Sequence, residues 1–122
     1  MANAINWFEI PASNHTRAVN FYSEVLGADL QPMEMGDVKM AFLNVDEESV
    51  GGAICYGEGY KPSADGTLVY LNGGDDLSVP LARVEKAGGR IVMRKTKISD
   101  EIGFMAAFID SEGNKIALHS LK

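Results

Sequence analysis

The sequence predicts an α+β fold made of two βαβββ modules, each with one strand, one helix and three further strands. Three observations predict it. A first strand–helix unit opens with Asn6 to Ile10, and its helix closes at Gly27. A second unit opens with Leu68 to Leu71, and its helix closes at Gly88-Gly89. The two units lie roughly sixty residues apart, and self-similarity at a fixed period indicates a repeated architecture.

The first module is expected to begin with a strand over residues 5–10, where two apolar-rich faces alternate up to Pro11. Ser13 or Asn14 can cap the helix that follows, and Gly27 suits its left-handed end. The buried stripe of this helix recurs at three- and four-residue spacing: Ala18, Phe21, Tyr22, Val25 and Leu26.

Strands and turns fill the remainder of the first module. Two or three strands are expected within residues 28–57, separated by turns at Gly36-Asp37 and at Asp46-Glu47-Glu48. The segment from Gly57 to Gly66 contains further glycines and a proline, so it is expected to link the modules.

The second module repeats this order. A strand is expected from Gly66 to Asn72, followed by a helix capped by Asp76 or Ser78. The apolar stripe of that helix is Leu77, Leu81, Val84 and Ala87. The remaining strands are expected at residues 90–97, 103–109 and 115–120, with a tight turn at Asp110 to Asn114.

The composition favours a single domain over residues 1–122, with module one at about 1–58 and module two at about 66–122. Its 46% apolar and 23% charged residues are ordinary for a globular protein. The net charge of -6 disfavours nucleic acid and an anionic membrane as partners. Cys55 is the only cysteine and no export signal opens the chain, so we expect a cytoplasmic protein.

Two motifs carry a resemblance to a known family. The first runs from Arg17 to Tyr22 and continues with Val25-Leu26-Gly27; the second runs from Asp110 to Leu118. With the helix end at Ala87-Gly88-Gly89, the chain resembles the vicinal oxygen chelate superfamily, also called the glyoxalase, bleomycin-resistance and dioxygenase superfamily. The resemblance implies that the modules form a curved mixed sheet around a cup. It also implies that a small member is a homodimer.

The resemblance also implies where a metal would bind, on the first and last strand of each module. Those positions fall here at Trp7, about Gly52, Thr67 and Ala117. None of the four supplies the imidazole or carboxylate that a divalent transition metal needs. We therefore expect no metal and no other cofactor.

Strand alternation extends the predicted cup face from these positions. Glu9 and His119 are its expected ionisable pair, acting as catalytic acid and base, or else forming a structural ion pair. Cys55 should face a helix as an inert thiol. If Met33, Met35 and Met40 border the cup, they favour a ligand of loosely defined shape. The expected ligand-binding residues are Trp7, Ile54, Tyr56, Thr67 and Val69, with plain core as the alternative.

These residues lead us to expect a glyoxalase-like protein that binds a small organic molecule in a metal-free apolar cup, with or without converting it. If it is an enzyme, the resemblance implies a lyase or isomerase, and the residues at the metal positions imply that it needs no metal. One alternative is a metal-dependent lyase, isomerase or dioxygenase of the same superfamily. Another is a drug-sequestering protein of the bleomycin-resistance kind.

Overall fold

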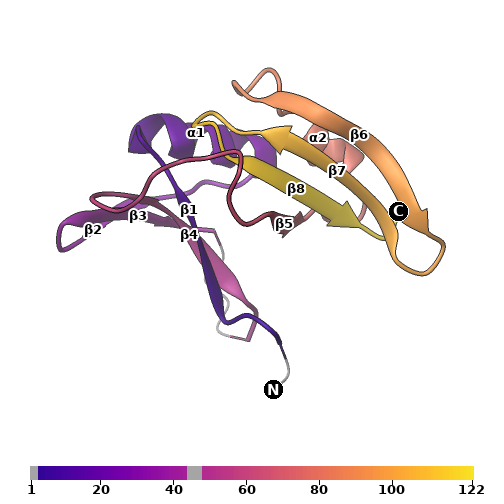
Figure 1. The fold of residues 1–122 in the computed structure, drawn as a ribbon, viewed down its shortest axis with the longest axis horizontal. Coiled ribbons are helices and arrows are strands. Elements are labelled where there is room, and N and C mark those ends of the chain that lie inside the picture. Colours follow the sequence, from indigo (N-terminus) through magenta and orange to yellow (C-terminus); the bar gives the residue numbers. More distant parts are fainter. Residues whose placement is uncertain (1–2, 44–47) are drawn as a thin grey trace.

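A computed structural model describes residues 3–43 and 48–122 of the chain. It contains two four-stranded sheets, one from each module, and Figure 1 shows them side by side with α1 between their upper ends. The expected turn at Asp46-Glu47-Glu48 falls mostly outside the described residues. Within the described ranges no helix is long and apolar enough to cross a membrane.

The first module has the predicted order of elements. Its elements are β1 (Trp7–Pro11), α1 (His15–Leu26), β2 (Pro32–Met35), β3 (Val38–Phe42) and β4 (Gly51–Tyr56). The strands lie in the order β1-β4-β3-β2. The β1–β4 pair is parallel and the other pairs are antiparallel. This is the βαβββ unit that the sequence predicts.

The second module repeats the topology, but its first strand and its helix are shorter than predicted, and its second strand extends past residue 97 to Ser99. Its elements are β5 (Val69–Asn72), α2 (Ser78–Leu81), β6 (Arg90–Ser99), β7 (Gly103–Ile109) and β8 (Lys115–Ser120), in the order β5-β8-β7-β6. The fifth strand is shorter than predicted because Val69 pairs with Ile116, so Thr67 would have to pair with Asn114, which the preceding turn holds.

The second helix is also shorter than predicted, ending at Leu81. Beyond it, backbone hydrogen bonds span three residues from Val84 to Leu81 but four from Ala87 to Arg83. A regular α-helix does not form from such mixed spacing. The apolar stripe is nevertheless buried as expected, because Leu77 and Val84 are fully inaccessible.

Both ends of α1 are capped as the sequence predicts. The Asn14 side chain accepts a hydrogen bond from the Arg17 N–H at 3.1 Å. Gly27 ends the helix with φ of 65°, a conformation that glycine adopts without steric cost.

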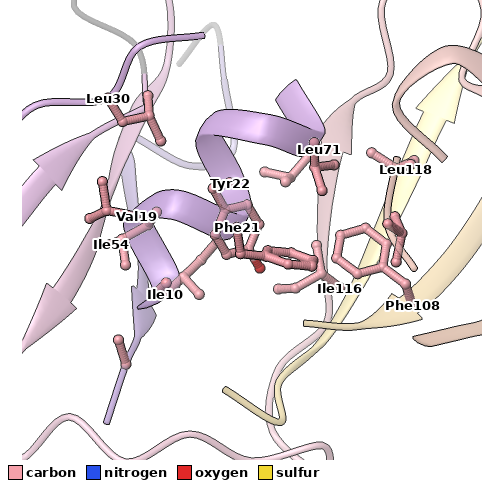
Figure 2. Close-up of a cluster of buried hydrophobic side chains, with 14 of the residues drawn as sticks. Ile10, Val19, Phe21, Tyr22, Leu30, Ile54, Leu71, Phe108, Ile116 and Leu118 are labelled. Carbon is pink, nitrogen blue, oxygen red and sulfur yellow. The ribbon is translucent and has the colours of Figure 1, made fainter. Parts of the chain in front are cut away.

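The apolar face of α1 joins the two modules in one core (Figure 2). Phe21 from α1 packs against Phe108 from β7, with ring centroids 5.8 Å apart. Gly89 allows this approach, since a Cβ there would lie 2.7 Å from the Phe21 ring. The buried cluster therefore runs from Ile10 and Ile54 on one sheet to Ile116 on the other.

A buried polar network joins the same elements. Asp110 and Asn114 close the turn between β7 and β8, and both are 4% exposed. Asp110 accepts hydrogen bonds from the Tyr22 hydroxyl at 2.6 Å and from the Asn114 side chain at 3.0 Å. Burial and the charge of Asp110 raise the Tyr22 pKa well above its usual value, so Tyr22 stays a donor.

Asn114 extends this network to the first module. Its side-chain amide donates to the Pro11 carbonyl at 2.8 Å, and its oxygen accepts from the Ser63 N–H at 3.0 Å. One side chain thus fixes the end of β1 and the linker between the modules.

Glu112 holds the N-terminus of α1 from the same turn. Its inaccessible carboxylate accepts from the Arg17 guanidinium at 2.6 Å and from the Asn14 N–H at 2.7 Å. Burial favours the neutral acid, but hydrogen bonds from Arg17, Asn14, Ser111 and Ser13 outweigh it and lower the Glu112 pKa to about 2.

We expect the charge of Glu112 to stabilise the fold in a defined pH window. Because its pKa falls from 4.5 to about 2 on folding, the contribution is complete above the unfolded pKa and is lost as the pH falls towards the folded one. Glu112→Gln should lower the free energy of unfolding by about 1–3 kcal/mol at neutral pH and by less in acid.

Urea unfolding of both proteins at several pH values measures this difference. Glu24→Gln, on the exposed side of α1, is the matched control and should match the parent protein. A difference between parent and Glu112→Gln that stays constant down to acid pH would contradict the expectation.

Candidate functional site

The register of the first sheet defines two faces. Ile10 pairs with Ile54, and both belong to the core beneath α1. The neighbouring pairs, Trp7 with Gly51 and Glu9 with Ala53, lie on the opposite face because side chains alternate along a strand. We call this opposite face of the first sheet the open face. It also carries, from β2 and β3, Met33, Met35, Met40 and Phe42.

The predicted orientation of β4 is wrong. Gly52, Ile54 and Tyr56 were expected on the same face as Trp7, but Trp7 pairs with Gly51. A shift of one residue moves every side chain of a strand to the other face. Ile54 is therefore fully buried beneath α1, and Tyr56 lies in register with Lys39, away from the open face. Gly52 faces the Phe8 ring, which lies 2.5 Å from where its Cβ would be.

The same correction applies to Val69 in the second sheet. Val69 pairs with Ile116 and packs against the core, so it does not share a face with Ala117. Ala117 pairs with Tyr70, and His119 pairs with Asn72 on that same side. Ala117 and His119 thus lie on the same face of the sheet, as predicted. The side chains of the fifth strand lie on the faces opposite to those predicted.

Glu9 lies at the centre of a polar cluster on the open face. Its carboxylate accepts the Tyr60 hydroxyl at 2.7 Å and the Trp7 indole N–H at 3.3 Å. The Trp7 ring packs edge-on against Phe42, with centroids 5.6 Å apart. Hydrogen bonding to Glu9, assisted by partial burial, raises the Tyr60 pKa to about 12. Tyr60 therefore remains a hydrogen-bond donor to Glu9 at neutral pH.

Cys55 belongs to this cluster, and its predicted orientation towards a helix is wrong. It pairs with Pro11 on β1 and with Met40 on β3, on the same side as Glu9. Burial and the charge of Glu9 raise its pKa to about 11. Since the thiolate is the nucleophile, the thiol is inert at neutral pH, as the sequence suggests.

Glu9 and His119 are not brought together. Within the described residues no hydrogen bond or ion pair joins them. The partners of Glu9 are Tyr60 and Trp7, whereas His119 Nε2 lies 2.6 Å from the Ile102 carbonyl. The structure therefore gives His119 a contact at the end of the second sheet.

A cleft of about 330 Å³ follows the seam between the two sheets. Among the predicted residues it brings together Glu9, Thr67 and Val69. Trp7, Ile54, Tyr56 and His119 are not among its lining. Apolar walls come from both sheets: Phe8, Ile10, Pro11, Val69 and Ile116.

Three polar residues of the lining were not predicted from the sequence. Lys61 and Ser63 come from the linker, and Lys115 from the first residue of β8. The signal that could have found Lys115 is its position directly after the Asp110–Asn114 turn. The linker residues have no periodicity from which a face could be read.

The residues at the positions implied for a metal do not fit one. Trp7 and Ala117 carry no metal-binding group. Gly51, which pairs with Trp7, has no side chain, and Tyr70, which pairs with Ala117 in place of the predicted Thr67, offers only a phenol hydroxyl. Thr67 lines the cleft with a hydroxyl group only. Across residues 3–43 and 48–122, no three histidine, cysteine or acidic side chains are grouped so that they could hold a metal ion.

Comparison with solved structures supports the fold. The trypanothione-dependent glyoxalase I of Leishmania major is 21% identical, with a TM-score of 0.66 over 98% of this chain and 88% of that one. A glyoxalase/bleomycin resistance protein from Albidiferax ferrireducens is 12% identical, with a TM-score of 0.68 over 97% and 98%. A glyoxalase I variant from Zea mays is 16% identical, with a TM-score of 0.69 over 97% of this chain and 45% of that one.

No curated protein sequence matches the chain closely enough to be called a relative. A family model does match, and it covers residues 4–118. The match includes both motifs that carried the resemblance, as well as the paired βαβββ modules. The chain therefore belongs to the Glyoxalase/Bleomycin resistance protein/Dioxygenase superfamily.

Proposed function

We propose that this chain binds a small organic molecule in the cleft between its two sheets, and that it does so without a metal ion. The observation that carries the proposal is the position of Glu9, a carboxylate on the wall of a largely apolar cleft of about 330 Å³. Clefts of this size, with apolar walls and few polar groups, are typical of small-molecule sites.

Glu9 retains hydrogen-bonding capacity for a ligand. A carboxylate offers about four lone-pair sites. Tyr60 and Trp7 occupy one site on each oxygen and hold the group in position. A preorganised acceptor loses less entropy when a ligand donor binds to it. If the ligand is converted, the same carboxylate is the group placed to accept its proton, as in a lyase or isomerase.

The lone thiol of Cys55 is consistent with a cytoplasmic protein. It is buried and its raised pKa keeps it protonated, so it needs no disulfide partner.

Glu9→Gln tests the role of the carboxylate. It keeps the size of the side chain but removes the charge, so binding of a ligand found by thermal-shift screening should be lost while stability stays nearly unchanged. Glu34→Gln, on the other face of the first sheet, is the matched control and should bind normally.

The opposite result would identify Glu9 as structural. In that case Glu9→Gln would lower the free energy of unfolding by roughly 1–3 kcal/mol and leave ligand affinity intact. Calorimetric titration together with urea unfolding separates the two results.

The metal-dependent alternative predicts a different elemental composition. We expect protein purified without added metal to contain far less than one equivalent of zinc, nickel, iron or manganese per chain. The reason is that neither the paired positions Trp7, Gly51, Tyr70 and Ala117 nor the predicted Thr67 offers an imidazole or a carboxylate. Plasma mass spectrometry measures this, and a stoichiometric metal that survives dialysis would show that the proposal of metal-free binding is wrong.

We propose further that the chain is a homodimer that covers its open face. Trp7 is 43% exposed there, and Met33 and Met35 are 41% and 51% exposed. The outer strands β2 and β6 each present an unpaired edge. Apolar patches and open edges are commonly covered by a two-fold contact.

Light scattering should give twice the chain mass of 13.2 kDa at micromolar concentration. Met35→Lys should shift the protein towards monomer, because it places a charge on the open face. Glu34→Lys, one residue away on the other face of β2, is its control and should remain dimeric. A parent protein with the monomer mass would end this part of the proposal.

A further inference from the structure

We infer that the ligand of the cleft carries an anionic oxygen group, a carboxylate or a phosphate, bound between Lys61 and Lys115. This inference rests on the proposed function and names the chemical class of its ligand. Both lysines line the same cleft as Glu9 although they come from different segments, the linker and the start of β8.

Some polar side chains of the cleft already form hydrogen bonds within the chain, and others have no such partner. Asn114 is used, because its amide donates to Pro11 and Asp110 while its oxygen accepts from Ser63. The Ser63 hydroxyl accepts from the Asp65 N–H, which leaves its own hydrogen available. Within the described residues Thr67, Lys61 and Lys115 have no hydrogen-bond partner for their side chains.

The free groups are therefore mainly donors. The lining includes two lysines and two residues with a hydroxyl group, against one carboxylate that already accepts two hydrogen bonds. A bound molecule satisfies such a site best by supplying acceptors, and a charged acceptor forms the stronger bonds. An anionic oxygen group has this chemistry, whereas an amine would meet two like charges.

The local charge differs in sign from that of the whole chain. The chain has a net charge of -6, but the cleft holds two lysines against one glutamate. The ion pairs among the described residues use Arg17, Lys95 and Lys97, so Lys61 and Lys115 are left unpaired. Exposed charges separated by more than about 8 Å are largely screened at physiological salt, so a bound anion responds chiefly to the charges of the cleft itself, two lysines and one glutamate.

The apolar walls and the volume of the cleft indicate the chemistry and size of the rest of the ligand. Phe8, Val69 and Ile116 offer apolar surface, and about 330 Å³ is at the small end of ligand cavities. A small aromatic or aliphatic acid, or a small phosphate ester, matches this combination of charge and shape. A hydroxyl or N–H on the same molecule would meet Glu9.

The test compares probes that differ only in charge. Phenylacetate, its neutral counterpart phenylacetamide, and phenyl phosphate are titrated into isotope-labelled protein and followed by NMR shifts at Glu9 and Thr67. We expect the anions to bind about tenfold more tightly than the amide, and binding to weaken as salt is added. Tighter binding of phenyl phosphate than of phenylacetate would assign a phosphate, and the reverse a carboxylate.

Variants then identify the groups responsible. The double substitution Lys61→Met with Lys115→Met should bring phenylacetate down to the affinity of the amide, roughly a tenfold loss. Lys86→Met, an exposed lysine outside the cleft, should leave the affinity unchanged. All three lysines are exposed, so the variants should fold, and the dispersion of the NMR spectrum checks this.

The failures of the two proposals can be told apart. If the amide binds in the cleft as tightly as the acid, or if the double variant keeps its preference for the acid, this inference is overturned while small-molecule binding stands. If no probe shifts Glu9 or Thr67 at about ten millimolar, which means a binding free energy weaker than about 3 kcal/mol, while the thermal-shift screen finds a neutral ligand that does, this inference falls alone. If neither the probes nor the screen gives a ligand that shifts these residues, both proposals fall.

Discussion

The hydrogen-bond network of Asp110 and Asn114 is the interaction on which the rest of the structure depends. Both side chains are almost fully buried, where an unpaired polar group costs about 1–3 kcal/mol. Every contact they make therefore constrains an element. Tyr22 orients α1, the Pro11 carbonyl fixes the end of β1, and the Ser63 N–H fixes the linker. A single turn in the second module thus positions two elements of the first module, α1 and β1, and also the linker between the modules.

This network also explains why a cleft lies between the sheets. The strands pair in two separate sheets, and the edge strands β1 and β5 both contribute residues to the cleft. The modules are joined instead through the core beneath α1 and through the turn at Asp110 to Asn114. Pro11, Ser63 and Asn114 are both network members and cleft lining. The hydrogen bonds that hold the two modules together therefore also hold this wall of the cleft in position.

The elements that the sequence predicts well are those with a local physical signal. The caps at Asn14 and Gly27 and the turn at Asp110 to Asn114 each depend on side chains within a few residues. The register of β4 has no such signal, because neither family motif lies close enough in the sequence to anchor it. Gly51 and not Gly52 lies opposite Trp7, and this difference of one residue puts Ile54, Cys55 and Tyr56 on the faces opposite to those predicted.

The contrast between two glutamates separates stability from function in this chain. The Glu112 side chain is inaccessible; its Oε1 accepts hydrogen bonds from Ser13, Asn14 and Arg17, and its Oε2 accepts from Arg17 and Ser111. Its carboxylate has no free lone pair with which to bind a ligand. Its hydrogen bonds form when the chain folds, so they contribute to stability. Glu9 is exposed, accepts one hydrogen bond on each oxygen and borders a cleft. A carboxylate with unused lone pairs in a preorganised position can bind something outside the chain, and this distinguishes Glu9 from a structural acid.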